Sequence, residues 1–300
     1  MSRLLCVGLG YTAGALAARM RSAGWHVTGT ARTTAGAARV APACDATIVF
    51  DGEWPSLALD RAIATATHVL ASAPPAESGD PIITQHGRAL AASPSLAWIG
   101  YLSTVGVYGD HQGGWVDETT PVKPLAERGR RRVDAERVWL GLAAQTGKRV
   151  QVFRLPGIYG PGRSAFDGLR DGSARRIVKP GQVFNRVHVA DIAQVLAIAM
   201  QGGGGEAIYN VCDDEPAPPA DVIAFAARLI GVAPPVEETF DAAKLSPMAA
   251  SFYAESKRVR NALIKADFGV RLLYPSYREG LAAIAAGNGH GSGAVQAPPV

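Results

Sequence analysis

The stretch VGLGYTAG, residues 7–14, decides the fold, because an apolar run leads into it and an alanine-rich helical pattern leads out of it. Segment 3–7 is short and apolar, which fits a buried parallel strand. Segment 12–23 carries apolar and small residues at helical spacing. Gly8 and Gly10 therefore lie in a tight turn between a strand and a helix.

In this context the glycines and Ala13 match the pattern G-x-G-x-x-A of dinucleotide-binding units. The first glycine permits the turn, the second lets the backbone approach a pyrophosphate, and the small third residue lets the helix pack on the strand. The helix start offers free N–H groups and a positive dipole end to phosphate. The predicted phosphate-binding residues are Gly8, Gly10, Tyr11, Thr12 and Ala13. A glycine turn without a ligand is the alternative.

The composition indicates a globular protein that binds no nucleic acid. The chain has 300 residues, 48% of them hydrophobic and 19% charged, with a net charge of +4. Its basic residues are scattered apart from Arg128 and the run 130–132, which no aromatic residue interrupts. Such a run is typical of a solvated helix face. A small anionic ligand remains compatible with it.

The sequence lacks a disulfide pattern, a long apolar segment and a metal-ligand motif, and these features predict the compartment and the metal content. Cys6, Cys44 and Cys212 are far apart and odd in number, which argues against a disulfide framework and for a reducing compartment. The first residues enter a strand directly, and no run reaches about 18 apolar residues. The histidines show no metal-ligand spacing with the cysteines. We therefore expect a cytoplasmic protein with no membrane partner and no metal.

Cofactor choice is predicted from the end of the second strand, 26–31. At this point an acidic residue would bind the ribose of NAD, whereas an arginine accommodates the 2′-phosphate of NADP. The chain has Arg32 followed by Thr33, and no Asp or Glu between 22 and 40. NADP is the expected cofactor and NAD the second option. A surface arginine without a ligand is the alternative for Arg32.

The remaining strands repeat a strand–helix rhythm. Strands 47–50 and 68–71 end at Asp51 and just before Ala73, with helical stretches between them. This rhythm predicts a doubly wound parallel sheet, which binds ligands at the carboxyl ends of its strands. Asp51 and Ala73 therefore join the glycine turn and Arg32 as expected cofactor contacts.

The fifth strand, 98–102, leads into Ser-Thr-Val-Gly-Val-Tyr-Gly, residues 103–109. This segment resembles the Ser-Ser-x-x-Val-Tyr-Gly motif of the extended short-chain dehydrogenase/reductases, the NAD(P)-dependent epimerase/dehydratase family. The resemblance implies that Thr104 hydrogen-bonds the reacting oxygen, and it makes Ser103 the second catalytic candidate. Capping of the strand end is the alternative role for these hydroxyls.

The resemblance continues over residues 3–284. Further matching segments are Asp117-Glu118 with Pro121, RLPGIYGPGR at 154–163, NRVHVADI at 185–192, YNVCDDEP at 209–216 and PSYREGL at 275–281. It implies a Rossmann fold with a small interleaved C-terminal substrate-binding subdomain, and a cofactor contact at Pro156. We expect an NAD(P)-binding domain at 1–160, a smaller substrate-binding part at 161–286 with 183–212 returning to the first domain, and a disordered tail at 287–300.

One departure from the family pattern concerns its Tyr-x-x-x-Lys pair, which supplies the general acid/base. Counting back from Glu136, the two positions hold Arg128 and Arg132, and 125–138 contains neither Tyr nor Lys. An arginine stays protonated, so Arg128 cannot shuttle a proton as a phenol does. Arg132 can still donate to the cofactor ribose. The chain is thus identified as an atypical member of the family.

Three arginines are candidate substrate ligands. Arg163 and Arg186 are expected in loops that face the cofactor in the family, where they can pair with a phosphate or carboxylate, and Arg128 is the third. Surface ion pairs are the alternative for the first two. Asp191 is expected to cap a helix at 192–200, with a catalytic pair of His188 and Asp191 as the alternative.

Two functions remain open from the sequence. The first is an NAD(P)-dependent oxidoreductase or epimerase/dehydratase acting on a small polar, sugar-like or phosphorylated substrate, with the proton supplied by water or another side chain. Tyr108 and Tyr159 are the remaining phenols for that role. The second is a non-catalytic NADP(H)-binding redox sensor or regulatory protein. The resemblance also implies a homodimer.

Overall fold

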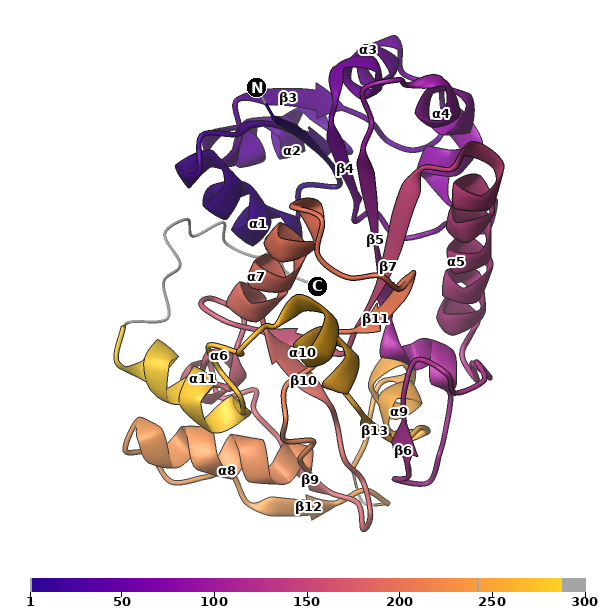
Figure 1. The fold of residues 1–300 in the computed structure, drawn as a ribbon. Coiled ribbons are helices and arrows are strands. Elements are labelled where there is room, and N and C mark those ends of the chain that lie inside the picture. Colours follow the sequence, from indigo (N-terminus) through magenta and orange to yellow (C-terminus); the bar gives the residue numbers. More distant parts are fainter. Residues whose placement is uncertain (1, 242, 288–300) are drawn as a thin grey trace.

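A seven-stranded parallel sheet forms the centre of the protein in a computed structural model that describes residues 2–241 and 243–287. Its strands lie in the order β11-β7-β5-β4-β1-β2-β3, so the chain starts in the middle of the sheet and winds outward in both directions (Figure 1). These strands are β1 (Arg3–Val7), β2 (His26–Ala31), β3 (Ala46–Val49), β4 (His68–Ala71), β5 (Trp98–Thr104), β7 (Arg149–Leu155) and β11 (Ile208–Asn210). The doubly wound Rossmann fold is confirmed.

Helices cover both faces of this sheet, and each face has its own core. The helices are α1 (Tyr11–Ser22), α2 (Thr34–Val40), α3 (Leu57–Thr65), α4 (Pro81–Ala92), α5 (Glu127–Thr146), α7 (Val189–Met200) and α10 (Ala262–Phe268). One core packs α1 and α7 against the strands, and the other packs α3, α4 and α5. Because helices bury both faces of the sheet, its strands carry apolar side chains on both sides. Their sequences therefore do not alternate strictly between apolar and polar residues.

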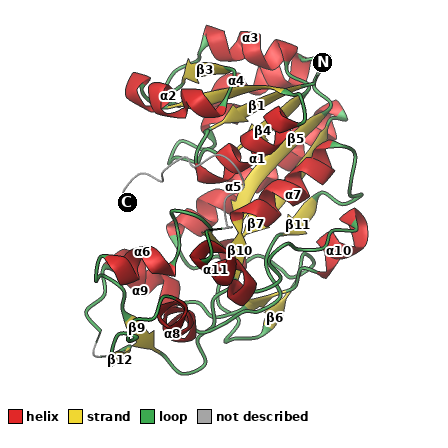
Figure 2. Cartoon of the chain, turned by 90° about the vertical axis from the view of Figure 1, so that its left-hand side faces the viewer, coloured by secondary structure: helices red, strands yellow, loops and turns green. Residues whose placement is uncertain are grey.

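A smaller part lies below the carboxyl ends of the strands in Figure 2. It contains α6 (Ala165–Arg170), α8 (Pro219–Leu229), α9 (Pro247–Tyr253), α11 (Tyr277–Ala285) and the short strands β9 (Arg176–Val178) and β12 (Glu237–Thr239). Phe166, Val222, Tyr277 and Leu281 form its buried cluster. Parallel two-stranded pairs link β8 (Gly157–Tyr159) to β10 (Arg186–His188), and β6 (Trp115–Val116) to β13 (Arg258–Val259). The domain boundaries stay a prediction.

The helix after β10 corrects the expectation for Asp191. The helix begins at Val189, three residues earlier than expected, and His188 is its N-cap, since His188 Nδ1 accepts a hydrogen bond from the Ala190 N–H at 3.2 Å. Asp191 lies in the first turn instead, where its carboxylate accepts hydrogen bonds from the N–H groups of Leu273 and Tyr274 at 2.6 and 3.1 Å. Asp191 therefore fastens a distant segment to α7.

Other boundaries differ only slightly from the expected ones. Strand β5 extends to Thr104, so the two hydroxyl residues belong to the strand end itself. The expected disordered tail begins at Gly287, which lies in a turn after α11 and whose N–H donates to the Ile284 carbonyl at 3.1 Å. The rest of that tail, 288–300, lies outside the described residues.

None of the described helices combines the length and the apolar character that crossing a membrane requires. The thiols of Cys6, Cys44 and Cys212 are free and buried.

Candidate functional site

The glycine turn joins β1 to α1 at the carboxyl edge of the sheet. Gly8 has φ +89°, and a Cβ on it would lie 2.9 Å from the backbone nitrogen of Ala73, so the close approach of the two strand ends requires glycine here. Ala13 is fully buried, as expected of the small residue that lets the helix pack on the strand. Nothing lies within 4 Å of where a Cβ of Gly10 would be. This side of the turn is therefore open.

The start of α1 fits a pyrophosphate. Gly10 is the N-cap and no side chain caps its free N–H groups, and the first turn contains no acidic residue. The uncapped N–H groups and the dipole of this twelve-residue helix therefore face an open approach. Tyr11 begins the helix and its hydroxyl donates to the Pro161 carbonyl at 3.0 Å, while Thr12 is buried.

Other expected cofactor contacts follow neighbouring strands at the same edge. Arg32 is exposed directly after β2. Thr33 is the N-cap of α2, since its Oγ1 accepts from the Gly36 N–H at 3.0 Å. Asp51 follows β3 and accepts from the Glu53 N–H at 2.9 Å. The exposed guanidinium beside the sheet edge is free to meet a phosphate.

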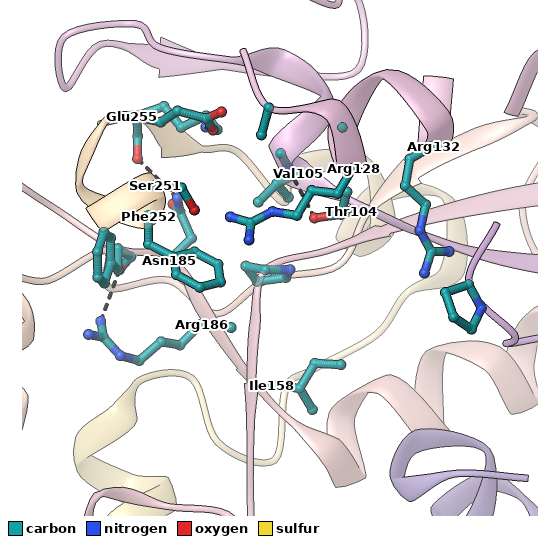
Figure 3. Close-up of a pocket in the computed structure, with 18 of the residues that line it drawn as sticks. Thr104, Val105, Arg128, Arg132, Ile158, Asn185, Arg186, Ser251, Phe252 and Glu255 are labelled. Atoms are coloured by element: carbon teal, nitrogen blue, oxygen red, sulfur yellow. Dashed lines mark hydrogen bonds and ion pairs between the residues drawn. The ribbon is translucent and has the colours of Figure 1, made fainter. Parts of the chain in front are cut away.

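A cavity of about 760 Å³ opens beside this edge, between the Rossmann part and the smaller part (Figure 3). Its walls come from the segments after β4, β5 and β7, from the start of α5, from β10 and from α9 with the loop after it. Six of the predicted site residues line it: Thr104, Arg128, Arg132, Pro156, Arg163 and Arg186. The glycine turn, Arg32, Thr33, Asp51, Ala73 and Ser103 do not.

The two hydroxyls at the end of β5 have different surroundings. Thr104 lines the cavity, and its Oγ1 accepts from the Gly106 N–H at 3.1 Å. Ser103 is 6% exposed and donates to Glu136 Oε1 at 2.5 Å. Successive residues of a strand face opposite sides, so only one of the pair can reach the cavity. Thr104 is thus the hydroxyl available to a ligand.

Arg132 is held in the cavity wall by groups of β5. Its Nη1 donates to the Leu102 carbonyl at 2.5 Å and to the Tyr101 hydroxyl at 3.1 Å. Tyr101 in turn stacks on Trp139 with ring centroids 5.8 Å apart. These bonds use a single nitrogen of the guanidinium, which leaves its other N–H groups for a ligand.

Arg128 extends from α5 toward α9 across the cavity (Figure 3). Its Cζ lies 4.1 Å from the centre of the Phe252 ring. Arg163 lies in the turn after β8, with its Cζ 5.8 Å above the ring of Tyr11. Arg128 thus enters the cavity lining from α5, and Arg163 from the turn after β8.

Arg186 lies at the start of β10, not in a loop as expected. Its Nη1 donates to the carbonyls of Phe184 and Ala217 at 2.9 and 3.1 Å, and its side chain points away from Thr104 in Figure 3. Burial lowers the pKa of this guanidinium. Arg186 therefore lines the cavity wall, but part of its guanidinium already donates to backbone carbonyls.

Acidic residues of the wall are all paired. Glu127 binds Arg130 and Arg131 at 2.8 and 3.4 Å, and Glu255 binds Lys257 at 2.7 Å. Within the described residues, Arg128, Arg132, Arg163 and Arg186 form no ion pair. The cavity therefore carries a surplus of positive charge, which favours an anionic ligand.

The other phenols lie outside the cavity lining. Tyr108 donates to Asn210 Oδ1 at 2.9 Å, and Tyr159 donates to the Ser276 carbonyl at 3.2 Å. Burial raises the pKa of both hydroxyls. Both side chains pack in the protein interior, so neither is positioned to donate a proton to a ligand in the cavity.

Several wall residues were not found from the sequence: Asn185, Ser251, Phe252, Glu255 and Lys257. Asn185 directly precedes β10 and opens the family segment 185–192, while the other four lie in or just after α9, which carries no recognisable motif of its own. In the described part of the chain, no three His, Cys, Asp or Glu side chains are grouped to hold a metal ion.

Residues 6–212 match the model of the NAD dependent epimerase/dehydratase family. The chain belongs to this family. Within it, the protein is 32% identical over 251 residues to protein YeeZ of Escherichia coli strain K12, covering 78% of this chain and 86% of that protein. The family match over residues 6–212 includes the glycine turn, the end of β5 and the start of α5.

Solved structures agree with the family assignment. A functionally unknown conserved protein from Silicibacter pomeroyi is 49% identical, with a TM-score of 0.86 over 96% of this chain and 99% of that one. A dTDP-glucose 4,6-dehydratase from Bacillus anthracis, solved with NAD, has a TM-score of 0.76 over 95% of this chain and 96% of that one. Its 16% identity means that the likeness concerns the fold. The cofactor class, a nicotinamide dinucleotide, follows from membership of the NAD dependent epimerase/dehydratase family.

Proposed function

We propose that the protein is an NADP(H)-dependent oxidoreductase or epimerase/dehydratase whose substrate is small, polar and carries a phosphate or carboxylate. The observation that carries this proposal is the open cavity lined by Thr104 and by guanidinium groups that form no ion pair among the described residues. A protein that only sensed its cofactor would need no such cavity. NADP is preferred over NAD because Arg32 is exposed where the 2′-phosphate of NADP would lie.

Each residue near the cavity has a role in this proposal. The start of α1 binds the pyrophosphate, and Arg132 donates to the nicotinamide ribose from α5, where the Leu102 carbonyl of β5 holds its side chain. The bound cofactor supplies or accepts a hydride. Thr104 orients the reacting oxygen of the substrate and stabilises negative charge that develops there.

The proton comes from a source other than the family tyrosine. Arg128 stays protonated and serves as a binding group. Tyr108 and Tyr159 are buried away from the cavity, so we assign proton transfer to water or to another cavity group. This difference predicts slower chemistry than that of relatives with a Tyr-x-x-x-Lys pair.

The test is a turnover screen with purified protein. Sugar phosphates, uronates, hydroxy acids and matched neutral sugars are each incubated with NADPH or NADP, and the absorbance of the reduced nicotinamide and the stereochemistry of recovered sugars are followed. Turnover restricted to anionic compounds supports the proposal. Tight NADPH binding without turnover of any compound would favour the redox-sensor alternative. The cytoplasmic location and the homodimer stay predictions, the latter measured by sedimentation equilibrium.

A further inference from the structure

Arg128 and Phe252 bring the Rossmann part and the smaller part together across the cavity. Arg128 stands in the first turn of α5 and Phe252 in the last turn of α9, and both line the cavity. Their distance of 4.1 Å from Cζ to ring centre is the shortest of the arginine–aromatic contacts among the described residues. An arginine at this distance over an aromatic face is attracted to the ring.

Arg128 differs from the arginines next to it. Arg130 donates to Glu127 and to the Leu125 carbonyl at 2.8 Å each, and Arg131 donates to Glu77 at 2.8 Å. Across the described residues, the Arg128 side chain makes neither a hydrogen bond nor an ion pair, and its aromatic contact is the ring of Phe252. The face of its guanidinium is thus occupied while its N–H groups remain free.

Phe252 is presented to the cavity by the anchoring of its neighbour. The ring of Tyr253 packs against those of Phe184 and Phe240, with centroids 5.3 Å apart in each case. Lys179 also donates to the Tyr253 carbonyl. Phe252 keeps 51% of its surface exposed and lines the cavity, so its ring is accessible there.

We propose that Phe252 is a positioning residue that holds the Arg128 guanidinium in the cavity, where Arg128 binds the phosphate or carboxylate of the substrate. The stacked face leaves the guanidinium edge, with its N–H donors, for an oxyanion. The position that holds the proton-transfer tyrosine in the family thus holds an anion-binding arginine here, supported by a residue of the smaller part. The inference rests on the anionic substrate of the proposed function and names the residues that select it.

The test observes Arg128 itself in the full-length protein. Its Nε–Hε resonance is assigned by comparison with Arg128→Gln, and is then followed during titration with inorganic phosphate, with acetate and with glycerol as a neutral probe. We expect saturable shifts with phosphate or acetate and none with glycerol. The tighter of the two anions identifies the substrate group as phosphate or carboxylate.

Substitution of Phe252 tests the positioning role. Phe252→Leu keeps an apolar side chain but removes the ring, and should increase the mobility of the Arg128 side chain and raise the Kd for the preferred anion roughly threefold to tenfold. Phe252→Tyr keeps the ring and should restore binding to about the wild-type level. The matched control is Trp115→Leu, which removes an exposed ring 4.9 Å from Arg260 outside the cavity and should leave anion binding unchanged.

Contrary outcomes separate the two proposals. If neither anion shifts the Arg128 resonance, or if Phe252→Leu leaves both its mobility and the anion Kd unchanged, the inference is wrong. If Arg128→Gln turns over an anionic substrate with the wild-type KM, the inference is again wrong while the proposed function stands. If anions bind at Arg128 but no compound is turned over, the proposed function fails while the anion site stands.

Discussion

Arg154 Nη2 lies 2.7 Å from Glu136 Oε2 in a pair whose side chains are only 4% and 5% exposed. Glu136 also accepts from Ser103, and Arg154 Nη1 donates to the Tyr108 hydroxyl at 2.9 Å, so the pair ties α5 to β5 and β7 beneath the cavity. Glu136 follows Arg132 and Arg128 at steps of four residues, which places all three on one face of α5. The buried pair therefore sets the rotation of α5 that turns both arginines toward the cavity.

Glu136→Gln should destabilise the protein strongly, because it leaves the Arg154 charge buried without a counter-charge. We expect a loss of about 3–5 kcal/mol in the free energy of unfolding, measured by urea denaturation. The control is Asp134→Asn on the same helix, whose partner Arg137 is exposed, with an expected change within about 0.5 kcal/mol. Equal stability of the two variants would contradict the structural role of the pair.

Arg32→Ala should weaken NADPH binding by about ten- to a hundredfold and leave NADH binding nearly unchanged, because a charge-assisted contact to the 2′-phosphate contributes about 1.5–3 kcal/mol. Calorimetric titration of both cofactors measures this. Arg39→Ala, an exposed arginine in the last turn of α2, is the control. Equal affinity of the wild-type protein for NADPH and NADH would refute the assignment of Arg32.

Thr104→Ala should lower kcat on an identified substrate by roughly a hundredfold and leave the cofactor Kd nearly unchanged, because the hydroxyl stabilises charge that develops during reaction. Thr104→Ser retains a hydroxyl and should keep most of the activity. The readout is steady-state kinetics combined with cofactor titration. Unchanged turnover in Thr104→Ala would mean that the active site lies elsewhere.

Arg132→Ala should weaken cofactor binding, since Arg132 is expected to bind the nicotinamide ribose from α5 with its side chain anchored to β5. The double variant Arg128→Tyr with Arg132→Lys restores the family pair and should raise reductase activity toward generic carbonyl compounds, because a phenol can transfer the proton that arginine cannot. The rate with NADPH is the measurement. No gain in a folded double variant that still binds NADPH would show that more than the proton donor differs.

Asp213→Asn should change how stability depends on pH. Burial raises the pKa of this 2% exposed carboxyl to about 8, while Arg186 acts in the opposite direction and Asp214 and Glu215 raise it further. The folded state then holds a proton that the unfolded state releases near pH 4, so the contribution of Asp213 to stability declines as pH rises from about 4 to 8. Asp213→Asn should remove this decline, of the order of a few kcal/mol, in thermal melts. The control is the exposed Asp221→Asn, and parallel pH profiles for wild type and Asp213→Asn would contradict the assignment.

The sequence by itself determined the elements whose signals are local. The glycine turn, the strand–helix rhythm and the hydroxyls after the fifth strand are each set by residues within about ten positions of one another, because turns and helical or strand periodicity depend on near neighbours. These signals predicted the parallel sheet and the cofactor edge, whereas the role of Thr104 was implied by the resemblance of residues 103–109 to the family motif. The four-residue spacing of Arg128 and Arg132 likewise placed both on one face of their helix.

Only the tertiary structure decided which of these residues are in contact and which other segments complete the cavity wall. Ser103 and Thr104 look equivalent in the sequence, and burial of Ser103 against Glu136 separates them. Asp191 has the sequence context of a helix cap, whereas in the structure its carboxylate accepts hydrogen bonds from the N–H groups of Leu273 and Tyr274. Phe252 reaches Arg128 from more than a hundred residues away along the chain, and no periodicity encodes such a contact. Long-range packing of whole elements, not local backbone preference, brings these side chains together.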